Sequence, residues 1–276
     1  MSGAGVERSW EALRQVAVDV AREAGAYVAS ARAARAPEVA ATKSSATDVV
    51  TEVDTASEQL VRSLLSARRP GDRLLGEEGG EHVLGDAAAA SGPSVRWIVD
   101  PIDGTVNFLY GIPQYAVSVA AQVDGVVVAG AVYDVDRGEC WSAARGSGAA
   151  RDGERLSVRP VAPRDQQLVL TGFSYDPATR RIQGAAVASL LPQVRDIRRM
   201  GSAALDLCAV AAGRADAYVE EGPQLWDHAA AGLIAEEAGA RLEVRRGAGG
   251  ADLVVCAPAG AFEEFAVLVE TCGFAG

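Results

Sequence analysis

Residues 97–108 read WIVDPIDGTVNF, an apolar run that leads into two aspartates and a glycine. The apolar part predicts a short buried strand that delivers Asp100 to the edge of a sheet, where α/β folds usually place their ligands. Pro101 has no N–H to donate and a fixed φ, so we expect the chain to turn sharply there. Such a turn can aim Asp103 back beside Asp100 and leave the Ile102 carbonyl as a further oxygen ligand.

The two residues that follow suit an anion. Gly104 lets the backbone approach a ligand closely, and Thr105, with free N–H groups ahead of a helix, could receive phosphate. Asp-Pro and Asp-Gly are also common turn dipeptides, and either one alone is better explained as a plain turn. Both together at the end of a buried strand favour a ligand site.

Periodicity extends this picture in both directions. Apolar residues at three- and four-residue steps predict a helix over residues 7–34 and a second helix over about 54–70. Two strand-like segments, 115–123 and 126–133, flank an Asp-Gly pair at 124–125, which predicts a hairpin.

Strand-like and helical segments alternate from residue 167 onward. The expected strands are 169–171, 196–199, 216–220 and 253–256, and the expected helices are 179–191, 202–212 and 228–238. This order predicts a layered α/β fold, mixed α+β, with antiparallel sheet early and mixed sheet late. We expect one domain over residues 7–272, with an α+β half over about 7–160 and an α/β half over about 165–272.

The composition excludes several classes of protein. The 276 residues carry 26 basic and 37 acidic side chains, a net charge of −11, which argues against a protein that binds nucleic acid. No apolar run approaches the roughly 18 residues of a membrane span, and the N-terminus does not read as a signal peptide. The four cysteines are widely scattered. We therefore expect a reduced cytoplasmic protein without a membrane or nucleic-acid partner.

Histidine usage narrows the metal chemistry. With only His82 and His228 in the chain, a His-rich zinc site or a Ser-His-Asp triad is hard to build. A bound metal should be a hard cation held by carboxylate and carbonyl oxygens, which means Mg²⁺ or Mn²⁺.

Four further positions are weak candidates when each is taken alone. Glu77 belongs to an acidic pair of the kind that is usually solvated, and Asp54 and Asp227 are equally plausible as helix caps. Lys43 is the single lysine beside 25 arginines, which suggests a role without defining one.

These candidates belong to a series of motifs that follow one another along the chain. The motifs are KSS at 43–45, D-x-VT-x-x-D at 48–54, GEE at 76–78, DPIDGT-x-NF at 100–108, GSAA at 201–204, AY-x-E at 217–220 and WD-x-A at 226–229. In this order they resemble the inositol monophosphatase family of Mg²⁺-dependent, lithium-sensitive phosphatases. Residues 171–186 resemble the SuhB-like bacterial branch, especially its actinobacterial members. The resemblance implies a layered αβαβα sandwich of the inositol monophosphatase and fructose-1,6-bisphosphatase type.

The resemblance also implies roles for individual residues. The implied metal ligands are Glu77, Asp100, the Ile102 carbonyl, Asp103 and Asp227, with Asp54 reaching a further, weaker metal. The implied catalytic residues are Glu77 and Thr105, which orient the attacking water, and Asp103. The implied substrate contacts are Asp103, Gly104, Thr105, Gly201, Ser202, Ala203, Glu220 and Asp227, with Lys43 as a possible addition.

The implied activity is hydrolysis of myo-inositol 1-phosphate and related sugar or polyol phosphates by direct attack of water. Two or three Mg²⁺ ions, or Mn²⁺ in their place, would assist, and the protein would be a homodimer. Alternatives on the same scaffold are a histidinol-phosphate phosphatase, a fructose-1,6-bisphosphatase and a bisphosphate nucleotidase. A lower alternative from another class is a transcription-antitermination protein that acts by interaction, without catalysis.

Overall fold

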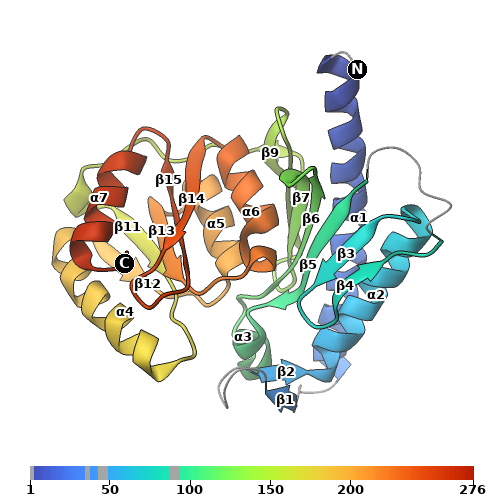
Figure 1. The fold of residues 1–276 in the computed structure, drawn as a ribbon, viewed down its shortest axis with the longest axis horizontal. Helices are drawn as coiled ribbons and strands as arrows, with labels where there is room; N and C mark the ends of the chain where they lie inside the picture. The colour runs from blue at the N-terminus through green and yellow to red at the C-terminus, as the bar shows by residue number, and fades with distance from the viewer. Residues whose placement is uncertain (1–2, 35–37, 43–48, 87–93) are drawn as a thin grey trace.

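Helices α1 (Gly3–Ala34) and α2 (Glu52–Arg68) cover one face of the larger of two main sheets (Figure 1). The computed structural model describes residues 3–34, 38–42, 49–86 and 94–276. Both predicted N-terminal helices are confirmed. Helix α2 starts two residues before Asp54 because Thr51 and Asp54 form a capping box, in which each side chain accepts the other's backbone N–H. No helix in these described ranges is both long and apolar enough to cross a membrane.

The larger sheet has eight strands in the order β10-β9-β8-β7-β6-β5-β3-β4. Only β3 and β5 pair in parallel. The predicted hairpin joins β6 to β7, and Asp124 and Gly125 both adopt the positive φ that a tight hairpin turn needs. The strands are β3 (Arg73–Gly76), β4 (Gly80–Val83), β5 (Arg96–Asp103), β6 (Ala116–Val123), β7 (Val126–Asp134), β8 (Glu139–Ala144), β9 (Gly148–Arg151) and β10 (Glu154–Arg155). A separate two-stranded sheet pairs β1 (Val39–Thr42) with β2 (Val49–Thr51).

Strand β5 corrects one expectation. The sequence predicts a sharp turn at Pro101, whereas the strand continues to Asp103. Its register against β6 shifts between Asp100 and Asp103, so that two residues of β5 stand opposite one residue of β6. Pro101 fits this bulge because it has no N–H to leave unpaired. The bulge therefore places Asp100 and Asp103 close together at the carboxyl end of β5.

Two buried helices separate the larger sheet from a smaller one, and two more helices cover the smaller sheet on its outer side (Figure 1). The smaller sheet has the order β12-β11-β13-β15-β14. The five layers confirm the expected αβαβα arrangement, although β1 to β4, β8, β14 and α7 were not among the predicted elements. The elements are β11 (Leu168–Thr171), α4 (Pro177–Leu190), β12 (Asp196–Arg198), α5 (Ala203–Ala211), β13 (Ala217–Glu221), α6 (Leu225–Glu237), β14 (Ala240–Arg246), β15 (Asp252–Pro258) and α7 (Phe262–Cys272), with the short α3 (Thr105–Tyr110) following β5.

Small residues bring the middle layer close to the larger sheet. A Cβ atom built on Gly130 of β7 would lie 2.9 Å from the Cα of Ala230 in α6. Backbone atoms cannot yield as a flexible side chain can, so a larger residue at position 130 would push α6 away. Because α6 also carries Asp227, this contact sets the distance of that candidate site residue from the larger sheet.

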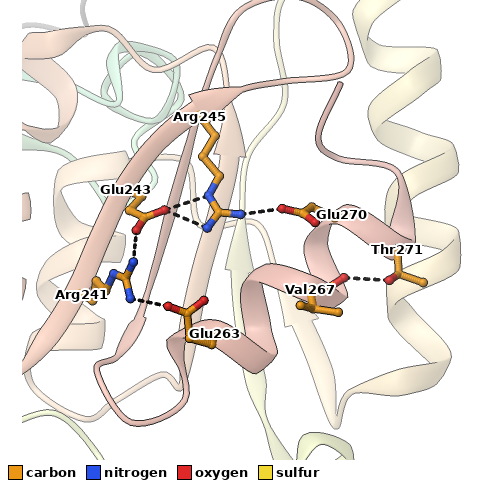
Figure 2. Close-up of polar contacts among 7 residues, drawn as sticks. All are labelled: Arg241, Glu243, Arg245, Glu263, Val267, Glu270 and Thr271. Atoms are coloured by element: carbon orange, nitrogen blue, oxygen red, sulfur yellow. Dashed lines mark hydrogen bonds and ion pairs between the residues drawn. The ribbon is translucent and has the colours of Figure 1, made fainter.

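Charged side chains cover the outer face of β14, one of the two edge strands of the smaller sheet (Figure 2). Arg241 pairs with Glu263 at 2.6 Å, and Arg245 pairs with Glu270 at 2.7 Å. Both arginines also contact Glu243. These ion pairs tie the edge strand to α7.

Candidate active site

The ends of β3 and β5 bring acidic residues from two segments together. Gly76 pairs with Val99 in the parallel register, and the next N–H, that of Glu77, donates to the Val99 carbonyl at 3.2 Å. Glu77 therefore lies beside Asp100 at the ends of these two strands. Burial, followed by the nearby charge of Glu77, raises the pKa of Asp100 well above its usual value.

Helix α6 adds a third acidic residue to this cluster. Carboxylate oxygens of Asp100, Asp103 and Asp227 all lie within 4.8 Å of one another. Asp227 occupies the third position of α6, where its Oδ2 accepts the Gln224 N–H at 2.6 Å. The residue is thus both a helix cap and a member of the cluster. An all-oxygen donor set of this kind suits a hard divalent cation and could hold a metal ion.

Asp103 links the cluster to α5. Its Oδ2 accepts from the Ser202 hydroxyl at 2.5 Å and from the Ala204 N–H at 2.7 Å. Burial raises the pKa of Asp103 to about 6, although these hydrogen bonds and the charge of Arg199 act in the opposite direction. Hydrogen bonds therefore fix the position of the Asp103 carboxyl, while burial disfavours its ionised form in the absence of a cation.

Thr105 lies between Asp54 and the backbone of the bulge. Its hydroxyl is 3.0 Å from Asp54 Oδ1 and 3.0 Å from the Ile102 carbonyl oxygen. A hydroxyl has one proton to donate and keeps lone pairs to accept a further hydrogen bond. Asp54 Oδ2 is occupied by Thr51, so Asp54 serves as a helix cap and as a partner of Thr105.

These groups open onto a cavity of about 470 Å³. Its floor is acidic, and Arg199 is the one basic side chain among the described residues that line it. The further lining residues include Ile102, Gly104, Thr105, Phe173, Ser174, Tyr175, Asp176, Gly201, Ala203, Glu220, Gln224 and Trp226. A site of this size accommodates a small molecule.

Glu220 stands in the cavity wall. Tyr218 donates its hydroxyl proton to Glu220 Oε2 at 3.0 Å. Burial raises the pKa of Glu220 to about 7. Near neutral pH this side chain can therefore accept a hydrogen bond from a ligand hydroxyl or, when protonated, donate one.

Most of the candidate residues that the structure describes line the cavity, and two of them, Ser202 and Asp54, do not. Ser202 is buried against Asp103 and caps α5, and it does not line the cavity. Lys43 lies outside the described residues. Asp54 reaches the site through Thr105 and is absent from the cavity lining.

Sequence reasoning did not assign a role to Arg199 or to the loop at 173–176, which contributes four lining residues. Arg199 could have been noticed as a basic residue two positions before Gly201. The loop carries no chemical pattern of its own, and its approach to the cavity depends on how the small sheet packs.

Comparisons with known proteins agree on one family. The profile of the Inositol monophosphatase family matches residues 9–271. The inositol-1-monophosphatase SuhB of Mycobacterium tuberculosis is 52% identical over 261 residues, which cover 90% of this chain and 89% of that protein. The Nus factor SuhB of Pasteurella multocida is 38% identical over 225 residues, which cover 81% and 82%.

A solved structure gives the same result for the fold. The structure of Mycobacterium tuberculosis SuhB superimposes with a TM-score of 0.82 at 44% sequence identity. The match covers 96% of this chain and 98% of that one. The layered arrangement seen here is thus shared along nearly the whole of both chains.

Proposed function

We propose that this chain, a phosphatase that belongs to the inositol monophosphatase family, hydrolyses myo-inositol 1-phosphate and related polyol phosphates. The observation that carries the proposal is the convergence of Asp100, Asp103 and Asp227 within 4.8 Å at the floor of a small-molecule cavity. The name inositol-1-monophosphatase, borne by a relative with 52% identity, supports the choice of substrate.

We propose Mg²⁺, two or three ions per site, as the cofactor, with Mn²⁺ as a substitute. Glu77, Asp100, the Ile102 carbonyl, Asp103 and Asp227 would hold it, with Asp54 close to a further ion. When bound, the cation supplies positive charge that stabilises the reacting phosphoryl group and lowers the pKa of the attacking water. The cluster fits this cofactor because it consists of oxygen donors whose acidic side chains outnumber Arg199, the one basic side chain among the described lining residues.

The attacking water would be oriented by Thr105 and Glu77. Thr105 donates its proton towards Asp54 or the Ile102 carbonyl, each 3.0 Å away, so a hydroxyl lone pair remains to accept from the water. Glu77 lines the cavity together with Asp100 and can accept the second water proton. The water oxygen then bonds to phosphorus as the phosphorus–oxygen ester bond breaks. The phosphate keeps one proton of the water, Glu77 takes the other and returns it to solvent, and the departing oxygen takes up one proton from solvent to leave as the alcohol.

The remaining lining groups would bind the substrate. Phosphate would meet the backbone N–H groups of Gly104 and Thr105. Polyol hydroxyls would meet Glu220 and the backbone of Gly201 and Ala203. Glu220 suits this role because its pKa of about 7 permits both donation and acceptance near neutral pH.

A second candidate function is interaction with the transcription machinery. The relative from Pasteurella multocida is named a Nus factor, and this observation alone favours it. The net charge of −11 suits a basic protein partner better than RNA. A catalytically inactive variant that rescues a deletion phenotype would support this function, whereas rescue by the active enzyme alone would eliminate it.

The experiment that tests the main proposal is phosphate release, measured with and without Mg²⁺. The substrates are inositol 1-phosphate, histidinol phosphate, fructose 1,6-bisphosphate and a nucleoside bisphosphate. We expect the highest kcat/KM for inositol 1-phosphate and loss of turnover in EDTA. A preference for another substrate would replace the named activity, and turnover in EDTA would refute the metal requirement. We also propose lithium inhibition, a homodimer and a cytoplasmic location, as in the family resemblance.

A further inference from the structure

One face of α2 carries three buried polar residues that reach different segments of the candidate active site. Asp54, Ser57 and Glu58 are spaced i, i+3 and i+4, which places them on the same side of the helix. Asp54 contacts Thr105, and the Ser57 hydroxyl donates to the Pro101 carbonyl at 3.3 Å. The mechanism above uses the first of these contacts but assigns nothing to Glu58.

Glu58 binds the loop that follows β3. Its Oε2 accepts the Glu78 N–H at 2.8 Å, and its Oε1 accepts the Gly79 N–H at 2.7 Å. The residue is only 6% exposed. Both carboxylate oxygens are therefore committed to consecutive backbone amides of one loop, a geometry that fixes the loop in position and orientation.

Two glycines make room for this carboxylate. A Cβ atom on Gly76 would lie 2.4 Å from the Glu58 carboxyl carbon, and one on Gly79 would lie 2.6 Å from its Oε1. Neither glycine has a positive φ, in contrast to Gly80. The absent side chains are thus explained by the close approach of Glu58 and not by the backbone conformation.

These contacts constrain Glu77, because its backbone is held on one side by β5 and on the other by Glu58. Its own N–H is held by the Val99 carbonyl of β5 at 3.2 Å, and the next two N–H groups are held by Glu58. Three consecutive amides are thereby tied to two different elements. The direction in which the Glu77 side chain leaves the backbone follows from both attachments.

We propose that Glu58 is a positioning residue: it holds the loop at 77–79 so that the Glu77 carboxylate remains beside Asp100, where the proposed divalent cation would bind. This inference rests on the proposed function, because it assumes that Glu77 is a metal ligand. Groups that orient a metal ligand through hydrogen bonds typically change metal affinity or activity by about 10–100-fold when removed.

Two variants test the role by different routes. Glu58→Gln keeps the volume, but its NH₂ group would face one of the two N–H donors, so one hydrogen bond is replaced by a repulsive contact. Gly79→Ala keeps glutamate at position 58, but the new methyl group pushes the Glu58 carboxylate away from the two amides. Glu52→Gln is the matched control, because it removes the same charge from an exposed position on the same helix.

The first readout is hydrogen exchange of the Glu78 and Gly79 amides, measured in EDTA. The second is Mg²⁺ affinity without substrate, measured by calorimetry. We expect both test variants to lose protection at these two amides and to bind Mg²⁺ about 10-fold more weakly. The KM for inositol 1-phosphate at saturating Mg²⁺ should change little, and Glu52→Gln should match the wild type throughout.

The outcomes separate the two proposals. A wild-type protein that neither binds nor requires Mg²⁺ would refute the proposed function and this inference with it. A wild-type protein that binds Mg²⁺, together with unchanged affinity and amide protection in both test variants, would refute the positioning role alone. If Glu58→Gln does not fold, Gly79→Ala provides the same test with the carboxylate retained. Weaker Mg²⁺ binding and lost amide protection in that variant would support the positioning role, and unchanged values would refute it.

Discussion

Replacing Asp103 by Asn should separate what this carboxyl does for the fold from what it does for metal binding. Burial raises its pKa from 3.8 to about 6, a net effect that already includes the hydrogen bonds from Ser202 and Ala204. One pKa unit corresponds to about 1.4 kcal/mol, so the ionised carboxylate destabilises the metal-free fold by about 3 kcal/mol at pH 7. Asn has the same volume, keeps one oxygen for the Ala204 N–H and carries no charge.

The pH dependence follows from the direction of this shift. A raised folded-state pKa means that the destabilisation is absent below about pH 4, where the carboxyl is protonated in both states. It grows as the pH rises and is complete above the folded-state pKa of about 6. In EDTA, Asp103→Asn should therefore be more stable than the wild type at pH 7 and equally stable near pH 4.

The assay is thermal unfolding in EDTA and in Mg²⁺ at both pH values, with phosphate release measured alongside. A change of 1 kcal/mol moves Tm by roughly 2–4 °C in chains of this size, so the variant should melt about 6–12 °C higher in EDTA at pH 7. Mg²⁺ should raise the Tm of the wild type but not of Asp103→Asn, which should also lose activity. A variant that melts lower in EDTA at pH 7, or that retains turnover at saturating Mg²⁺, would refute this reasoning.

Three further substitutions probe the water, the substrate and the packing of the middle layer. Thr105→Ala should lower kcat about 10²-fold through loss of water orientation, whereas Thr105→Ser should restore most of it; equal rates in the two variants would contradict the role of the hydroxyl. Glu220→Gln should raise KM for inositol 1-phosphate about 10-fold. It should also remove any change in KM between pH 6 and pH 8, because the pKa of Glu220 in the wild type is about 7. A pH dependence of KM that persists in the variant would show that another group causes it. Gly130→Val should destabilise the fold by about 1–3 kcal/mol or more in urea unfolding, because its side chain meets the backbone of Ala230; a neutral result would show that α6 can shift.

Local sequence patterns predict the parts of this fold that depend on neighbouring residues. The long helices follow from apolar periodicity, and the hairpin at Asp124 follows from turn chemistry. The pairing of Asp100 with Asp103 also follows from local residues, although the geometry is a bulge and not the expected turn. Strand β14 was not predicted, because its charged residues alternate on one face and mask the apolar positions on the other.

Contacts between distant segments account for what local patterns do not reveal. Ser202 binds Asp103 across 99 residues of chain, so its hydroxyl holds the carboxyl of another site residue, a contact that the local motif does not reveal. Glu58 reaches Gly79 across 21 residues, and on its own helix it reads only as one more acidic side chain. Arg199 directly follows β12 and lines the cavity together with residues from both sheets, an arrangement that the local sequence around Arg199 does not reveal.

The charged face of β14 has a consequence for how copies of this protein meet. An edge strand offers unpaired backbone groups to any neighbouring chain, and charged side chains along such an edge discourage that docking. Because Arg241, Glu243 and Arg245 are already neutralised within the molecule, a second β14 would gain no new ion pair by approaching. The β14 edge of the smaller sheet should therefore resist the addition of further strands, and hence fibre formation, at high concentration. The proposed dimer should form through some other surface.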